Sequence, residues 1–395
     1  MQDARRLALI SQGLGGARPF GTGQTAVQRG IEQLGYVQID TIAVINRSHH
    51  HCLWTRVPGY REAHLDALQK QRRIFEYWAH AAAYLPMRDF RYSLPYMRAI
   101  AAGQRHWRTP NPRAMRDVLA RVRAEGPLMA RDFEHSADRG EAWGWNWKPA
   151  KIALEQLFIE GQLMVSHREG FQKVYDLPER VLPADLDLSL PSDEELHRHL
   201  ILSTLRAHGL AREPEFSYLR KGMKAGIRAS LGMLQEAGEV IAVQIGRLPG
   251  PWYITPAILE SHSGRRVSRQ VHLLSPFDNA VIKRQRIQQL FASDYQIECF
   301  VPAHRRQFGY FCLPILYGTE LVGRLDPKAD RRRGELIVRS LHLEKPVRDL
   351  DAFSAKLAAR LRQLAAFNGC RSVIWQARRG DRAGLCLAAA LSRGE

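Results

Sequence analysis

Apolar residues in the middle of the chain recur at matching intervals in two segments. Each set contains two leucines, a glycine and one further aliphatic residue at the same offsets: Leu154, Leu157, Gly161 and Leu163, then Leu231, Leu234, Gly238 and Val240. In each set the leucines belong to an amphipathic helix, the glycine ends it, and two strands joined by a basic turn follow. The predicted strands are 162–167 and 172–177, then 239–245 and 251–254.

Two further amphipathic helices precede each of these segments. They are expected at 114–124 and 129–134 in the first copy, and at 193–208 and 214–220 in the second. Three helices followed by a two-stranded wing form the plan of the winged helix-turn-helix unit. Ile31, Leu34 and Gly35, before a strand at Val37, repeat the pattern near the N-terminus. The sequence therefore predicts three winged-helix units in tandem.

The first 105 residues are expected to be mainly helical. Helices are predicted at 4–12, 25–34, 41–56 and 60–70, with a short strand between the second and the third. Residues 74–84 are rich in aromatic side chains. At this density such side chains are more typical of a core than of a surface that stacks on bases.

From residue 267 onward the pattern changes to short alternating strands. They are predicted at 271–274, 295–301, 310–316, 320–326 and 335–343. Such strands predict a small barrel or curled sheet, which an amphipathic helix at 349–367 is expected to close. The predicted fold class is thus α+β, with three winged-helix units and then a small β-barrel carrying a C-terminal helix. Four domains are expected: 1–110, 111–183, 184–262 and 263–395.

The charge of the chain indicates its partner. Lys and Arg total 58 against 40 for Asp and Glu, giving a formal net charge of +18. An excess spread along the whole chain favours a polyanion, above all nucleic acid, although a generally basic protein is the alternative. Cations on the predicted wings and helices fit contact with DNA phosphates: Arg168, Lys173, Lys221, Lys224, Arg228 and Arg247. Alternatively the units pack on one another, because three cannot all enter one groove.

A basic turn at 328–334 is a further candidate for phosphate binding, although a solvated turn explains it equally well. Glu320 and Asp326 beside Lys328 suggest a metal-dependent nuclease. We disfavour that interpretation because no further carboxylate stands at metal-binding spacing.

Other classes of site and location are disfavoured by what the sequence lacks. No apolar run is long enough for a membrane span, and the N-terminus lacks the apolar core of a signal peptide, so a cytoplasmic protein without a membrane partner is expected. The five scattered cysteines are typical of reduced thiols. For the histidines at 49–51, contact with phosphate or helix packing is favoured over a metal. No metal or cofactor is predicted.

Gln38 and Asp40 are the candidates for catalysis. The segment around them alternates apolar and polar residues, so both side chains project from one face of a short strand. A carboxylate beside a carboxamide can hold one water, with Asp40 accepting its proton and Gln38 fixing its orientation. Such residues more often cap a helix or bind backbone, so the pair alone does not identify an active site.

Longer blocks around this pair resemble one bacterial family. The blocks occur in order along nearly the whole chain: 36–42, 47–51, 54–56, 77–80, 274–278, 309–314 and 323–331. They are similar to the YcaQ-like and AlkZ-type DNA glycosylases. The resemblance implies three winged helices and a barrel arranged in a C around DNA, with Gln38-Ile39-Asp40 as the catalytic motif. It also implies a hairpin that probes the lesion, for which 247–251 is the candidate and the hairpin at Arg331 the alternative.

The resemblance further implies a monofunctional DNA glycosylase that hydrolyses the N-glycosidic bond of N7-alkylated purines and unhooks interstrand crosslinks, leaving an abasic site. An N7-alkylated guanine carries positive charge and leaves readily, so a water and a stabilised sugar cation suffice. Asp40 would be the base and stabiliser, and Gln38 the anchor of the water. No lysine lies near the motif in sequence, which argues against a Schiff-base lyase. A crosslinked base is tied to both strands, so an open site is expected.

The expected partner is double-stranded DNA with alkylated purines or crosslinks, bound by a monomer in the cytoplasm in association with the nucleoid. The residues expected to contact DNA combine the motif region with the basic hairpins: Arg47, His49, His50, Arg56, Arg247, Lys328, Arg331 and Arg332. The alternative function is a non-enzymatic winged-helix transcriptional regulator, in which Gln38 and Asp40 merely brace a strand.

Overall fold

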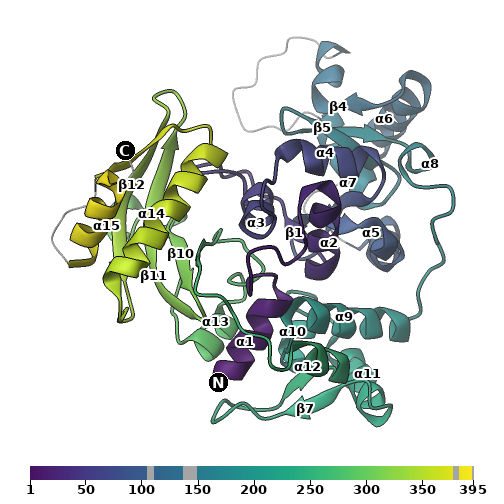
Figure 1. Ribbon diagram of the computed structural model, residues 1–395. Coiled ribbons are helices and arrows are strands. Elements are labelled where there is room, and N and C mark those ends of the chain that lie inside the picture. The colour runs from purple at the N-terminus through teal and green to yellow at the C-terminus, as the bar shows by residue number, and fades with distance from the viewer. Residues whose placement is uncertain (105–110, 137–148, 377–381, 394–395) are drawn as a thin grey trace.

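The computed structural model describes residues 1–104, 111–136, 149–376 and 382–393 (Figure 1). One order of elements recurs three times before a C-terminal sheet: a helix, a short strand or bridge, two helices and a hairpin. The fold is therefore mixed α+β. Within the described ranges no helix is both long and apolar enough to span a membrane.

The first unit follows helix α1 (Gln2–Ser11). Its elements are α2 (Gly23–Leu34), β1 (Val37–Gln38), α3 (Ser48–Arg56), α4 (Glu62–Lys70), β2 (Ile74–Trp78) and β3 (Ala82–Pro86). The strands pair antiparallel in the order β1-β3-β2. The helix expected from residue 41 begins only at Ser48, because residues 41–47 form an irregular loop.

The β2–β3 hairpin is absent from the sequence prediction because both of its faces are buried. Phe75 and Tyr77 belong to the core of the second unit, whereas Ile74 and Tyr84 belong to that of the first. No polar face therefore marks the strands. The apolar pattern at 31–37 consequently marks the first helix and first strand of this unit, and matching it to a third helix and its wing was wrong.

The second unit follows η1 (Met87–Ser93) and α5 (Leu94–Ala101). Its elements are α6 (Pro112–Glu125), β4 (Leu128–Met129), η2 (Ala130–Ser136), α7 (Pro149–Ile159), β5 (Met164–Glu169) and β6 (Gln172–Asp176). The strand order β4-β6-β5 repeats that of the first unit. The helix expected at 129–134 is instead a short strand and a 3₁₀ helix, because the Asp132 carboxylate accepts a 2.8 Å hydrogen bond from the Met129 amide.

The third unit follows the short helix α8 (Pro178–Val181). Its elements are α9 (Asp193–His208), α10 (Glu213–Phe216), α11 (Lys224–Glu236), β7 (Ile241–Val243) and β8 (Trp252–Ile254), with α12 (Pro256–His262) after them. An isolated bridge between Ala211 and Tyr253 takes the place of the first strand. The helix expected at 214–220 ends already at Phe216.

The C-terminal part is a five-stranded curled half-barrel with helices beside it (Figure 1). Its elements are β9 (Val271–Leu273), α13 (Arg284–Phe291), η3 (Ala303–Arg305), β10 (Leu313–Tyr317), β11 (Glu320–Asp330), β12 (Glu335–Leu343), α14 (Leu350–Phe367), β13 (Ser372–Trp375) and α15 (Arg382–Ser392). The order β13-β12-β11-β10-β9 leaves two edges, so the sheet is curled but not a closed barrel. Strand β13 runs parallel to β12.

The strand expected at 295–301 is a folded loop. The carboxylate of Glu298 accepts hydrogen bonds from the backbone amides of Gln307, Phe308 and Gly309, at 2.8, 2.8 and 3.1 Å. Because the carboxylate gathers three amides of a neighbouring segment, the backbone here bends instead of joining the sheet.

One hydrophobic core joins the first unit to the curled sheet. Val37 and Leu53 of the first unit pack in the same cluster as Leu325 of β11 and Leu357 of α14, and all four are fully buried. The position of β1 is therefore fixed relative to the sheet by shared packing.

Candidate active site

Gln38 and Asp40 share one face of an edge strand. Gln38 pairs with Ala83 of β3, and the Ile39 amide donates a 2.8 Å hydrogen bond to the carbonyl of Ala82, so the extended backbone continues beyond β1. Ile39 packs in the first core. Alternation along the strand therefore turns Gln38 and Asp40 to the opposite side.

His80 is the partner that orients Gln38. Its Nε2 lies 3.1 Å from the Oε1 of Gln38. Burial, and then the charges of Lys283 and Arg220, lower the pKa of His80 to about 4, so the ring is neutral near pH 7. A neutral ring protonated on Nε2 donates to Oε1 and leaves the amide hydrogens of Gln38 available for a water or a substrate oxygen.

Asp40 is half-buried and has one oxygen engaged by the backbone. Its Oδ1 accepts a 2.7 Å hydrogen bond from the amide of Ile42. Burial raises the pKa of Asp40, and this hydrogen bond partly offsets the rise. Burial and then the charge of Asp40 raise the pKa of Cys299, which places the segment around Cys299 within electrostatic range of the carboxylate. A carboxylate of raised pKa is a better base toward a water.

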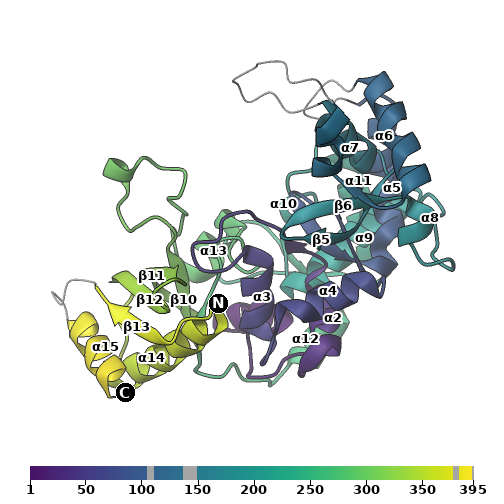
Figure 2. The same ribbon diagram turned by 90° about the horizontal axis from the view of Figure 1, so that it is seen from above.

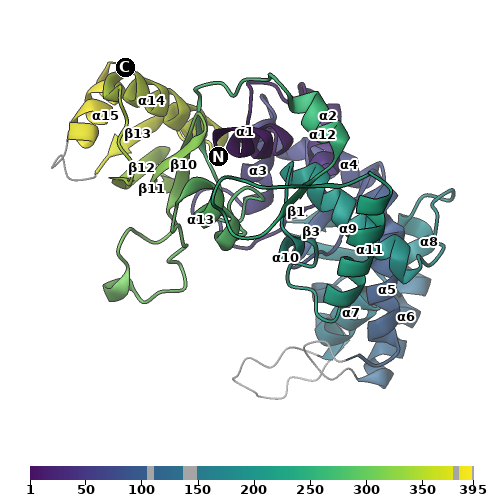
Figure 3. The same ribbon diagram turned by 90° about the horizontal axis from the view of Figure 1, so that it is seen from below.

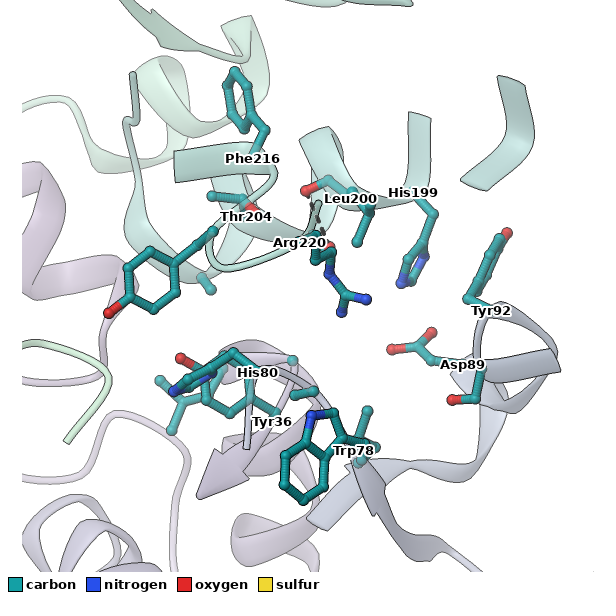
Figure 4. A pocket seen from close by; sticks show the side chains of 18 of the residues that line it. Tyr36, Trp78, His80, Asp89, Tyr92, His199, Leu200, Thr204, Phe216 and Arg220 are labelled. Atoms are coloured by element: carbon teal, nitrogen blue, oxygen red, sulfur yellow. Dashed lines mark hydrogen bonds between the residues drawn. The ribbon is translucent and has the colours of Figure 1, made fainter. Parts of the chain in front are cut away.

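A pocket of about 120 Å³ lies beside His80, between the first and third units (Figure 4). Aromatic side chains line much of it: Tyr36, Trp78, Tyr92, Tyr96 and Tyr218. The guanidinium of Arg220 points into the pocket from the third unit (Figure 4). The rings of Tyr218 and His80 are 5.3 Å apart and meet edge to face. His80 thus contacts Gln38 on one side and the third unit on the other.

Lys283 also lines this pocket, although no lysine is near the motif in sequence. Its Nζ donates a 3.2 Å hydrogen bond to the carbonyl of Glu215 and lies 3.8 Å from the carboxylate of that residue. Burial lowers the pKa of Lys283 to about 8. The fold therefore brings a lysine near His80 and ties it to a carboxylate.

Residues 275–279 hold the strand and α3 in place. Asn279 donates a 3.0 Å hydrogen bond from Nδ2 to the carbonyl of Tyr36, directly before β1. Asp278 accepts hydrogen bonds of 2.7 Å from both terminal nitrogens of Arg56, at the end of α3. These contacts tie the start of β1 and the end of α3 to one segment.

Three of the expected DNA contacts lie inside the protein. Arg56 is 1% exposed and bound to Asp278, and His49 and His50 are 2% and 8% exposed. The Nδ1 of His50 lies 2.7 Å from the hydroxyl of Tyr60. Because these side chains cannot reach a duplex in this structure, we withdraw Arg56, His49 and His50 as DNA contacts. Helix packing, one of the two alternatives for the histidines, describes their surroundings.

The other five expected contacts lie at or near the surface. Four are exposed and one is partly buried: Arg247, Lys328, Arg331, Arg332 and, partly buried, Arg47. The Nη2 of Arg331 donates to the carbonyl of Ile45, and the Ala329 amide donates a 3.1 Å hydrogen bond to the carbonyl of Val44. The β11–β12 hairpin is therefore attached to the loop that follows Asp40.

The β5–β6 hairpin of the second unit packs against the first unit. Arg168 donates two hydrogen bonds of 2.7 Å to the fully buried carboxylate of Glu76, and Lys173 lies 3.6 Å from it. The guanidinium groups of Arg47 and Arg168 lie over the ring of Phe171, at 3.8 and 4.3 Å. For this hairpin, the contacts favour packing between units over DNA contact.

Glu320 and Asp326 have structural partners. Glu320 contacts Arg5 and accepts a 3.1 Å hydrogen bond from Lys345. Asp326 accepts a 3.1 Å hydrogen bond from the amide of Phe311. Within the described part of the chain, no group of three or more His, Cys, Asp and Glu side chains could hold a metal ion. The disfavoured nuclease interpretation gains no support.

A family model described as DNA glycosylase AlkZ-like matches residues 31–367, which is most of the chain and includes Gln38 and Asp40. The chain belongs to the AlkZ-like DNA glycosylase family. Its structure also resembles the Streptomyces sahachiroi DNA glycosylase AlkZ with a TM-score of 0.62 and 15% sequence identity, covering 95% of this chain and 99% of that one. At this identity the likeness shows a shared fold, and the family supports a DNA glycosylase role.

Sequence reasoning found the motif but not the groups that orient it. His80 stands 42 positions from Gln38 and reaches it only because β3 pairs with β1. The available signal was the block 77–80, which carries part of the family resemblance. No pattern in the sequence relates Cys299 to Asp40, and the segment around Cys299 was interpreted as a strand.

Proposed function

We propose that this protein is a monofunctional DNA glycosylase that hydrolyses the N-glycosidic bond of N7-alkylated purines and unhooks interstrand crosslinks, leaving an abasic site. The observation that carries the proposal is the arrangement of Gln38, Asp40 and His80 in a chain of the AlkZ-like family. The proposed reaction uses protein side chains and water alone.

In this reaction a water oxygen bonds to C1′ while the bond from C1′ to the base nitrogen breaks. The bonding electrons leave with the base, which departs neutral because alkylation at N7 had made it cationic, so no general acid is needed. Gln38 holds the water oxygen through its amide hydrogens. Asp40 stabilises the sugar cation and takes the water proton. His80 is a positioning residue that fixes the Gln38 carboxamide.

We further assign the three repeated units to the winged-helix plan, and expect them to surround a duplex as a C together with the curled sheet. Support comes from the recurring order of elements and from the identical strand order in the first two units. Five cations at or near the surface are the proposed phosphate contacts of the monomer: Arg47, Arg247, Lys328, Arg331 and Arg332.

The hairpin that probes the lesion is, in this proposal, β11–β12. Arg331 and Ala329 bind the loop that follows Asp40, so a shift of this hairpin acts directly on that loop. The turn at Arg247 belongs to the wing of the third unit and is the other candidate. Attachment to the motif loop favours the hairpin at Arg331.

An excision assay tests the proposal. Duplex DNA containing 7-methylguanine is incubated with the protein and then heated in alkali, which cleaves the strand at an abasic site. We expect strand cleavage by the wild-type protein, its loss in Asp40→Asn, and its retention in the control Asp66→Asn on α4. DNA binding of Asp40→Asn, measured by fluorescence anisotropy, should stay within about twofold because the phosphate contacts remain.

A non-enzymatic DNA-binding regulator is the competing function. It predicts binding without cleavage by the wild-type protein on 7-methylguanine and on a duplex crosslinked by a nitrogen mustard. Cleavage of the first substrate but not of the second would keep the glycosylase and remove the unhooking activity.

A further inference from the structure

Phe300 and Leu219 are the two most exposed large apolar side chains of the described residues. They are 78% and 69% exposed, whereas every other exposed large apolar side chain is exposed by 52% or less. Leaving such large side chains in water forgoes the free energy that their burial would provide. Leu219 directly follows Tyr218, which contacts His80, and Phe300 directly follows Cys299, whose pKa the charge of Asp40 raises.

Leu219 is held in a strained backbone beside the partner of Gln38. It lies between α10 and α11 with φ +57°, in the left-handed region that a leucine rarely adopts. Its neighbour Tyr218 meets the ring of His80 edge to face, and His80 binds Gln38. Strain of this kind persists where the surrounding structure enforces it, and it clusters at functional sites.

Phe300 is displayed by the long segment between α13 and β10. Figures 2 and 3 both show this segment standing clear of the curled sheet, with η3 at its far end. The preceding residue, Cys299, lies within electrostatic range of Asp40. Phe300 thus stands beside Cys299 on a segment that projects from the curled sheet.

The segment that carries Phe300 is braced. Besides the three amides bound by Glu298, the Nε of Arg306 donates a 2.8 Å hydrogen bond to the carbonyl of Val301, and the Arg306 guanidinium lies 4.8 Å from the ring centre of Tyr310. These contacts hold the base of the loop while the phenyl ring stays in solvent. Because the loop is already ordered, it loses little further conformational entropy when its aromatic ring inserts into a partner.

Exposed basic residues follow both apolar side chains in the sequence. Lys221 and Lys224 follow Leu219 and are exposed, and His304 and Arg305 follow Phe300 and are exposed. Apolar side chains framed by cations match a base stack flanked by phosphates. This pattern favours duplex DNA over an apolar protein surface as the occupant.

We propose that Phe300 and Leu219 are apolar wedges that enter the base stack of duplex DNA on either side of the nucleotide presented to Gln38 and Asp40. The proposal rests on the proposed glycosylase function. Wedges of this kind unstack a base step and kink the duplex. Opening the stack beside the lesion lets C1′ approach a water held by the motif without a full swing of the base into a tight pocket.

The test uses 2-aminopurine placed beside 7-methylguanine in a duplex, because its fluorescence rises when the neighbouring stack opens. We expect the wild-type protein and Asp40→Asn to raise this fluorescence. Phe300→Ala and Leu219→Asn should each abolish most of the rise. Asparagine tolerates the left-handed conformation, so Leu219→Asn removes the apolar group while keeping the backbone. Leu188→Ala, at a residue that is 51% exposed elsewhere, is the control and should behave as wild type.

Excision provides the second readout. Each wedge variant should excise 7-methylguanine from a fully paired duplex about tenfold more slowly, the equivalent of about 1.4 kcal/mol. The loss should largely disappear when the lesion sits in a bulge, where the stack is already open, and Phe300→Trp should retain wild-type rates. If no protein excises the lesion but the fluorescence changes follow the variants, the glycosylase proposal fails and the wedges stand. Equal fluorescence for the wild-type protein and for a variant that combines Phe300→Ala with Leu219→Asn overturns the wedges.

Discussion

Arg56 and Asp278 form a fully buried ion pair that joins α3 to the segment after β9. Each terminal nitrogen of Arg56 lies 2.7 Å from one oxygen of Asp278, and both side chains are 0% exposed. Burial alone would raise the pKa of Asp278, but the charge and hydrogen bonds of Arg56 hold the pKa below its usual value. The pair therefore stays ionised. It holds α3 to the segment whose Asn279 binds the backbone directly before β1.

Removing one partner of this pair should destabilise the protein strongly. Asp278→Ala leaves a buried guanidinium without its carboxylate, which costs about 3–5 kcal/mol. Urea denaturation followed by circular dichroism measures the loss. The double variant Arg56→Met with Asp278→Leu should recover much of it, because apolar replacement removes both charges together. An Asp278→Ala protein as stable as the wild type would contradict the buried pairing.

His80→Ala should lower the rate of excision without weakening DNA binding. Without the bond to His80, the Gln38 carboxamide rotates freely and presents the wrong atom to the water in part of the molecules. We expect kcat to fall about tenfold, with KM nearly unchanged. Because both residues act on one group, His80→Ala combined with Gln38→Ala should be no slower than Gln38→Ala alone. Additive losses in single-turnover kinetics would show that His80 acts independently of Gln38.

Buried histidines should make the fold sensitive to mild acid. Burial lowers the pKa of His51 and of His80 to about 4, and that of His199 and of His272 to about 3. In the unfolded chain a histidine pKa is about 6.5, so the unfolded state binds more protons between these values and stability falls as pH falls through the window.

For His51, which is fully buried, this linkage amounts to about 3 kcal/mol between neutral pH and pH 4. Urea midpoints at pH 7.5, 6 and 5 measure it. We expect a steady decrease, a shallower one in His51→Gln, and no change of slope in His304→Gln, where the side chain is exposed. A constant midpoint would show that the histidines are not buried in solution.

Elements with one polar face were predictable from the sequence, and elements buried on both faces were not. The helix expected at 349–367 is α14, and Asp349 caps it by accepting a 2.9 Å hydrogen bond from the Ala352 amide. The β2–β3 hairpin escaped prediction because it lies between two cores. The segment 295–301 shows the opposite error, since apolar alternation suggested a strand while Glu298 binds three amides of another segment.

The residues of the candidate site likewise include some that the sequence predicts and some that it does not. Gln38 and Asp40 stand two residues apart, so the period of a strand alone places them on one face. The position of His80 beside Gln38 depends on the pairing of β1 with β3, which joins residues 45 and 47 positions apart and which no local pattern encodes. Arg56 shows the limit of reasoning from charge, because a basic residue near the motif proved to be the fully buried partner of Asp278.

A monofunctional mechanism predicts that borohydride will not trap the protein on damaged DNA. Trapping needs a lysine amine that attacks C1′, and Lys283 is the lysine that lines the pocket beside His80. Its amine is buried and tied to Glu215, so it should not reach the sugar. Gel electrophoresis after borohydride treatment should show no covalent complex. A complex that disappears in Lys283→Met would identify Lys283 as a lyase nucleophile.

DNA binding should depend steeply on salt, and the exposed cations of the β11–β12 hairpin should contribute to that dependence. Each phosphate neutralised adds about −0.9 to the slope of log affinity against log salt, because counterions are released. Lys328→Ala and Arg332→Ala should therefore each make the slope shallower by about one. Arg121, whose charge is paired with Glu125 on α6, is the control, and Arg121→Ala should leave the slope unchanged. Equal slopes for all four proteins would place the duplex away from this hairpin and would favour Arg247 over Arg331 as the probe of the lesion.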